Sequence, residues 1–195
     1  MEFGFFKEAL AQSGIECYNI VEYVSEWGEY MDGIAAWAAQ LEWGRIWGLL
    51  ITAAAAALRD YPAPIIIIDM GTATTVTVLD KNGAFLGGSI CPGVRISSEA
   101  LSNRTAQLPG ISLEAPSRAI GRNTVDCMRS GLMLGSAMML DGLVERMEEE
   151  LGQRATVVAT GGIARYIIPM CKREIQYDHD LLLKGLVILY EKNKK

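Results

Sequence analysis

Four consecutive isoleucines, Ile65 to Ile68, run directly into Asp69, and this short stretch limits the folds that the chain can adopt. A continuous apolar run of this kind, entered through Pro62 and Pro64, is typical of a strand that is buried on both faces. Such strands occupy the middle of α/β sheets, where helices cover both sides. We therefore expect an α/β fold with the isoleucine strand at its centre.

The segments that follow keep the order of an RNase H-like fold, with three strands first and alternating helices and strands afterwards. Residues 74–80 alternate Thr and Val and residues 84–93 form a third strand, with a hairpin turn at "KNG" between them. The predicted fold class is an RNase H-like α/β lobe with a five-stranded mixed sheet and flanking helices. Further helices are expected at 93–108, 124–151, 163–170 and 180–195. Further strands are expected at 155–162, which ends in paired glycines, and at 174–178.

Two domains are predicted, because the sequence pattern changes from helical to strand-like at Pro62 and Pro64. Residues 1–62 are expected to be mostly helical and to pack on the lobe formed by residues 63–195. Thr124 is the predicted N-cap of the long helix that runs to residue 151. The apolar surface of that helix and of the Ala-rich run Ile46–Leu58 is large for a chain of this length, which predicts a homodimer.

Composition argues against several classes of protein. The net charge is −5 and no basic stripe is present, so a nucleic acid is not an expected partner. The four cysteines contain no C-x-x-C pair, which favours reduced thiols over disulfides or a zinc site. The most apolar run, Ile46–Leu58, is shorter than the ~20 residues of a membrane span. A cytoplasmic protein without a membrane segment is therefore expected.

Two turns carry the candidate chemistry. In "DMGTATT", Asp69 ends the buried strand, Gly71 permits a tight turn, and hydroxyls and backbone N–H groups follow that can hold phosphate oxygens or a cation. The alternative is a hairpin whose aspartate caps its own turn. In "ATGGIA", Gly161 and Gly162 follow a strand and open a helix, where an anion is favoured.

Three stretches of the sequence closely resemble the C-terminal half of type III pantothenate kinases, which belong to the acetate and sugar kinase/Hsp70/actin superfamily. They are "DMGTATTVTVLDKNGAFLGGSICPGVRISSEAL", "LPGISLEAPSRAIGRNTVDCMRSG" and "ATGGIA", in the family's order, and the resemblance covers about residues 42–191. It implies an actin-like ATPase lobe that phosphorylates pantothenate with ATP, in coenzyme A biosynthesis. It also implies a homodimer and a monovalent cation, K⁺ or NH₄⁺.

The family's site residues transfer to positions in this chain. Asp69 would ligate the monovalent cation, and Gly71 and Thr72 would contact ATP. Thr124 in "GRNT" and Arg45 would contact pantothenate. At the nucleotide, the resemblance also implies the paired glycines Gly161 and Gly162.

The chain departs from the family at two motifs. The 195 residues contain no D-x-G-N-T phosphate loop, and the family's G-A-D-R corresponds to "EWGR". Gly44 therefore occupies the position of the general base, and Glu42 is the one nearby carboxylate. Because phosphoryl transfer depends on positioning and charge stabilisation, we expect weakened or absent catalysis.

Three hypotheses follow. The first is a type III pantothenate kinase family member with weak or no turnover. The second is a non-catalytic, shortened lobe that serves as a binding or dimerisation module. The third is an RNase H-like nuclease, which would need several carboxylates around divalent metal ions.

Overall fold

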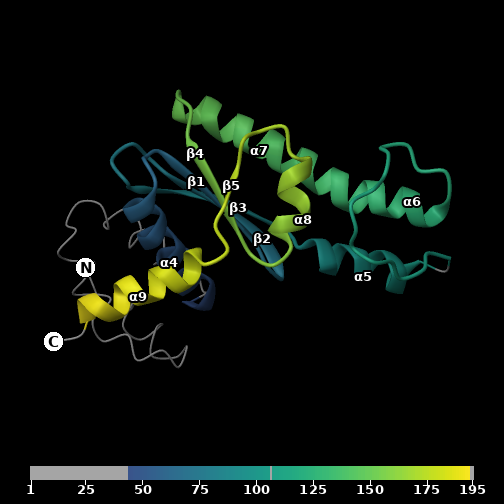
Figure 1. Cartoon of the computed structure of the whole chain (residues 1–195), viewed down its shortest axis with the longest axis horizontal. Helices are drawn as coiled ribbons and strands as arrows, with labels where there is room; N and C mark the ends of the chain where they lie inside the picture. Colours follow the sequence, from purple (N-terminus) through teal and green to yellow (C-terminus); the bar gives the residue numbers. More distant parts are fainter. Residues whose placement is uncertain (1–43, 106, 194–195) are drawn as a thin grey trace. The chain divides into compact units, whose positions relative to one another are not determined.

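A computed structural model describes residues 44–105 and 107–193 of the chain (Figure 1). Side chains are described from Leu50 to Glu191, apart from residue 106. Most of the predicted N-terminal segment, including Glu42, lies outside the described residues. The packing of residues 1–62 on the lobe therefore stays a prediction.

The described residues belong to two compact units, which are treated separately below. One unit consists of Ile68–Val76 and Ser89–His179. The other consists of the residues up to Ile67, of Thr77–Gly88 and of the residues from Asp180 onwards. The candidate turns at Asp69 and Gly161 both fall in the first of these units.

The strands form one five-stranded sheet, and the order β3-β2-β1-β4-β5 places the isoleucine strand in its middle. Ile65 to Ile68 are between 0% and 2% exposed, because the sheet covers their edges and side chains cover both faces. The predicted central strand is thereby confirmed. The strands are β1 (Ile65–Met70), β2 (Ala73–Leu79), β3 (Phe85–Pro92), β4 (Thr156–Thr160) and β5 (Gln176–Tyr177).

The sheet is mixed, as the sequence predicts. Two residues join β1 to β2, a connection that only antiparallel neighbours allow. Strand β5 instead runs parallel to β4, with Val158 opposite Gln176 and Ala159 opposite Tyr177. The predicted five-residue strand at 174–178 is reduced to two residues, which makes β5 a short edge strand.

In the unit that contains the chain's C-terminal region, helix α4 (Gly44–Asp60) packs against helix α9 (Leu181–Asn193). The contact is close because Gly185 has no side chain, and a Cβ atom there would collide with the backbone of Thr52. Four alanines of α4, at positions 53, 54, 56 and 57, are at most 4% exposed. The Ala-rich run is therefore a buried core helix. None of the described helices is long and apolar enough to cross a membrane.

The other unit holds the remaining helices: α5 (Val94–Arg104), α6 (Thr124–Arg129), the π-helical turn η1 (Ser130–Leu134), α7 (Gly135–Leu151), α8 (Ala164–Ile167) and the 3₁₀ turn η2 (Ile168–Met170). Helix α5 is shorter than the predicted 93–108. Its last turn is closed by the Thr105 hydroxyl, which donates to the Leu101 carbonyl at 2.6 Å. Thr105 itself is extended, with φ −124° and ψ 142°.

The N-cap of the long helix lies one residue earlier than predicted. Asn123, not Thr124, is the N-cap residue, and its side-chain oxygen accepts from the Asp126 N–H at 2.9 Å. Asn has the stronger capping preference, which leaves Thr124 as the first helical residue. The helix is not uniform either, because η1 inserts a π-helical turn between α6 and α7.

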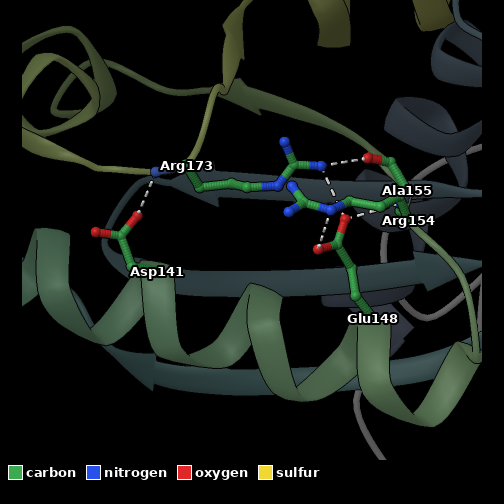
Figure 2. Close-up of polar contacts among 5 residues, drawn as sticks. All are labelled: Asp141, Glu148, Arg154, Ala155 and Arg173. Carbon is green, nitrogen blue, oxygen red and sulfur yellow. Dashed lines mark hydrogen bonds and ion pairs between the residues drawn. The ribbon is translucent and has the colours of Figure 1, made fainter.

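Partly buried charged side chains hold the long helix to the segment between α8 and β5 (Figure 2). The Asp141 carboxylate accepts from the backbone N–H of Lys172 at 2.9 Å and of Arg173 at 3.0 Å. The Arg173 guanidinium donates to Glu148 at 2.8 Å and to the Ala155 carbonyl at 2.9 Å. One helix face thus holds the loop that precedes β5 by charge-assisted hydrogen bonds.

Candidate functional site

The turn between β1 and β2 presents backbone and hydroxyl groups to solvent. Gly71 and Thr72 are exposed, and the Gly71 N–H donates to the Ala73 carbonyl at 3.0 Å across the turn. Asp69, at the end of the isoleucine strand, is only half-buried. The turn therefore combines one carboxylate, one threonine and several backbone groups within four residues.

The Asp69 carboxylate does not cap its own turn. In the described part of the chain no hydrogen bond reaches that carboxylate, and burial raises its pKa. The alternative considered for Asp69, an aspartate that caps its own turn, is found instead at Asp80 in the next hairpin. The Asp80 carboxylate accepts from the N–H groups of Asn82 at 2.8 Å and Ala84 at 2.7 Å. A partly desolvated carboxylate without donors is a site where a cation is stabilised.

The second glycine turn lies directly against the first. Gly161 has φ +97°, and a Cβ atom at this position would lie 2.5 Å from the carbonyl oxygen of Met70. Both the left-handed backbone and the absence of a side chain are therefore required here. The turn after β4 and the residue that precedes Gly71 are in backbone contact, as the pairing of β1 with β4 requires.

A third segment supports the first turn from the side of β3. A Cβ atom on Gly93 would collide with the Thr72 carbonyl oxygen and would lie 2.9 Å from the Gly71 carbonyl oxygen. Gly93 is not among the site residues predicted from the sequence. The signal available was the "CPG" at the end of a strand, where a glycine indicates close approach of another backbone.

Polar side chains surround the Gly161–Gly162 turn. The Tyr177 hydroxyl lies 3.4 Å from the Gly161 carbonyl oxygen and 3.3 Å from Nδ1 of His179. The Arg165 Nε donates to the Gly162 carbonyl at 3.2 Å. Both side chains therefore hydrogen-bond to carbonyl groups of the turn.

The remaining candidate residues lie elsewhere. Thr124 is exposed at the start of α6, which Figure 1 places at the outer end of the long helix, away from the β4–α8 turn. Gly44 and Arg45 are the first residues of α4, in the other unit, and the structure does not describe their side chains. Only Asp69, Gly71, Thr72 and Gly161 with Gly162 are brought together.

This group of residues suits an anion beside a hard cation. Carboxylate, hydroxyl and carbonyl oxygens are the ligands that hard cations prefer, and turn N–H groups are suited to phosphate oxygens. Asp69, a carboxylate that no hydrogen-bond donor of the described residues reaches, is the member of this group that could hold a cation. No group of three or more His, Cys, Asp or Glu side chains converges within the described ranges.

Comparison with known proteins decides between phosphate-binding classes. The sequence profile of the family described as type III pantothenate kinase matches residues 50–146. Relatives with this description include that of Exiguobacterium sibiricum, 49% identical over 144 residues, which are 74% of this chain and 56% of the relative. This part of the chain belongs to the type III pantothenate kinase family.

A second relative in the pantothenate kinase family gives the same result. The type III pantothenate kinase of Thermomicrobium roseum is 46% identical over 139 residues, which are 71% of this chain and 54% of the relative. The chain thus spans a little over half the length of the curated relatives that it matches.

The fold is also found in a solved structure of a conserved Baf family transcriptional activator from Campylobacter jejuni. The match has a TM-score of 0.52 at 21% identity and covers 71% of this chain and 62% of that one. At this identity the likeness supports the fold alone. The α/β lobe expected from the pantothenate kinase motifs is the fold that the structure has.

Proposed function

We propose that this chain binds ATP and pantothenate in the manner of a type III pantothenate kinase, the coenzyme A pathway's ATP-dependent pantothenate phosphotransferase, and that by itself it turns over weakly or not at all. The observation that carries the proposal is the backbone contact between the Asp69–Thr72 turn and the Gly161–Gly162 turn. The first of these turns lies in the segment, residues 50–146, that the family profile matches. Rigid turns of this kind keep N–H donors oriented before the ligand arrives.

In this proposal Asp69 holds a monovalent cation, K⁺ or NH₄⁺, next to the phosphates of ATP. The cation would supply positive charge beside the transferred phosphoryl group. Gly71, Thr72, Gly161 and Gly162 contact the nucleotide. Burial has already removed part of the water around the Asp69 carboxylate, so a cation there regains the stabilisation that water no longer provides.

The family resemblance assigns a pantothenate contact to Thr124 and another to Arg45, and the two assignments are proposed separately because these residues belong to different units. Thr124 is exposed and does not cap its helix, so its hydroxyl is available for a ligand. Weak turnover is proposed because Gly44 has no side chain that could accept the proton of the substrate hydroxyl. General base catalysis contributes ~10²–10⁴-fold, and Glu42 is two residues away from the required position.

The test uses the full chain with ATP and pantothenate. Isothermal titration measures each ligand's binding with and without K⁺, and a coupled assay for ADP measures turnover. We expect binding of both ligands, a K⁺-dependent rise in Tm, and little ADP. Robust K⁺-dependent turnover would disprove the loss of catalysis, whereas no binding of either ligand would disprove the assignment of the site.

Variants separate the two ligands. Asp69→Ala should abolish the K⁺-dependent rise in Tm, since ligand binding raises the stability of the folded state by mass action. Thr124→Ala should weaken pantothenate binding and leave ATP binding unchanged. The opposite pattern, with Thr124→Ala affecting ATP, would contradict the assignment.

We also propose that the chain forms a homodimer, which would serve as a binding or dimerisation module even without turnover. The support is exposed apolar surface on the long helix and on the loop before it. Met138, on α7, is 57% exposed, and Ile120, in the loop that precedes α6, is 82% exposed. Light scattering at micromolar concentration should give twice the chain mass. A monomer mass would rule this part out.

A further inference from the structure

Helix α9 carries an exposed apolar surface that the described residues do not cover. Leu183, Leu186 and Val187 are 61%, 55% and 50% exposed, and their spacing of three and four residues places them on one face. We call these three residues the α9 stripe. Apolar residues grouped in this way on a helix normally pack against another segment or another molecule.

The opposite face of α9 is already occupied. Leu181, Gly185 and Ile188 are buried, and Gly185 lies against the backbone of Thr52 in α4. Helix α4 therefore cannot also cover the stripe. A segment that covered the stripe would have to reach the surface of α9 that faces away from α4.

We propose that residues 1–43 of this chain cover the α9 stripe. Residues 1–43 end one position before Gly44, where α4 begins. Gly44 and Thr52 are eight residues apart, which is about 12 Å along a helix. Thr52 contacts Gly185, one residue before the stripe's Leu186. This short tether gives residues 1–43 a high effective concentration at the stripe.

Composition fits this occupant. Of residues 1–43, 25 are apolar (Ala, Val, Ile, Leu, Met, Phe, Trp, Tyr or Cys). Phe, Trp and Tyr side chains are prominent in the segment, and these bury the most area per residue. An apolar segment that is tethered next to an apolar helix face lowers the free energy of both by removing their surfaces from water.

Charge also fits. Residues 1–43 contain eight of the chain's 23 Asp and Glu residues and one of its 18 Lys and Arg residues. Residues 181–195 contain four lysines and a single glutamate. The acidic segment and this positively charged C-terminal stretch therefore attract one another, whereas a second copy would bring two stretches of like charge together.

Zero-length carbodiimide cross-linking of the full chain tests this proposal, because it joins a carboxylate to a lysine only where the two are in contact. We expect links between acidic residues of 1–43 and lysines of 181–195, identified by mass spectrometry. An equal mixture of ¹⁴N- and ¹⁵N-labelled chains distinguishes links within a chain from links between chains. Links of mixed isotope composition would show a second copy on the stripe and would overturn the proposal, as would no links.

A double variant, Leu186→Gln with Val187→Gln, tests the apolar part. Both side chains are at least half exposed, so the fold should persist, and circular dichroism verifies it. The yield of links within the chain should fall by about tenfold, since two apolar side chains no longer leave water. Ile90→Gln, at an exposed apolar residue of β3 that has no assigned role, is the control and should leave the yield unchanged. An unchanged yield in the double variant would overturn the proposal.

Discussion

Gly161 lies against the backbone of Met70, so closely that a Cβ atom would stand 2.5 Å from the Met70 carbonyl oxygen and 2.7 Å from its carbonyl carbon. The two residues are 91 positions apart in the sequence and meet because β1 and β4 are neighbours in the sheet. The contact joins the turn that carries Asp69 to the paired glycines. It makes the geometry of one turn depend on the other.

Gly161→Ala should therefore damage both stability and nucleotide binding. The substitution forces a side chain into a left-handed backbone and into the Met70 carbonyl, at a cost of about 2 kcal/mol or more. Tm should fall by about 4–8 °C. Gly142→Ala is the control, since its Cβ meets nothing within 4 Å on helix α7 and alanine favours helix. A Gly161→Ala variant as stable as Gly142→Ala would contradict the structure.

Asp69→Asn should stabilise the protein in the absence of K⁺ and remove its response to K⁺. Burial raises the Asp69 pKa, so the unfolded chain loses this proton at lower pH than the folded chain does. Stability therefore falls as pH rises from the unfolded pKa through the folded pKa, and the penalty persists at neutral pH. Asn carries no charge and avoids it.

The same linkage sets the pH dependence of cation binding at Asp69. K⁺ competes with the proton at Asp69, so the K⁺-dependent rise in Tm should shrink as the pH falls through the folded pKa. Thermal melts of wild type and Asp69→Asn between pH 4 and pH 8, with KCl or with choline chloride at equal ionic strength, measure both effects. A K⁺ response that is independent of pH would place the cation elsewhere.

Asn123→Ala should affect stability and Thr124→Ala should affect ligand binding, although the two residues are adjacent. Loss of the Asn123 cap should lower stability by about 1 kcal/mol, because the Asp126 N–H loses its acceptor. Thr124→Ala should change stability by less than about 0.5 kcal/mol. Its effect should be on pantothenate, with Kd rising by about tenfold for one lost hydrogen bond. Titration calorimetry and thermal melts on both variants separate the two roles.

Asp141→Ala should destabilise the unit that contains α7 by about 1–3 kcal/mol, because the backbone N–H groups of Lys172 and Arg173 lose their acceptor. Glu145→Ala is the matched control, since Glu145 is an exposed residue of the same helix and should cost less than about 0.5 kcal/mol. Urea unfolding followed by circular dichroism compares them. Equal midpoints for the two variants would show that the contacts in Figure 2 do not stabilise the fold.

Local pattern was enough to predict the strands, their succession along the chain and the central place of the isoleucine strand, whereas the full strand order of the sheet comes from the structure. Four buried isoleucines between prolines and a polar turn allow one interpretation, and the alternation after Gly71 has a period of two. The residues at which helices begin and end were harder to predict. The sequence of α5 could continue to Leu108, but Thr105 closes the last turn with its own hydroxyl, and Asn123 takes the cap that was predicted for Thr124. These outcomes depend on competition between neighbouring side chains, which a pattern does not rank.

The sequence by itself determined the family, the central strand and the two glycine-containing turns, because motifs in order and periodicity are properties of the chain alone. Only the tertiary structure decided that Asp69, unlike Asp80, keeps its carboxylate free of its own turn. It also decided that Gly93 and Gly161 support the Asp69–Thr72 turn from two sides. Both facts depend on backbone segments that are distant in sequence and adjacent in the sheet, so sheet pairing, not local preference, places them.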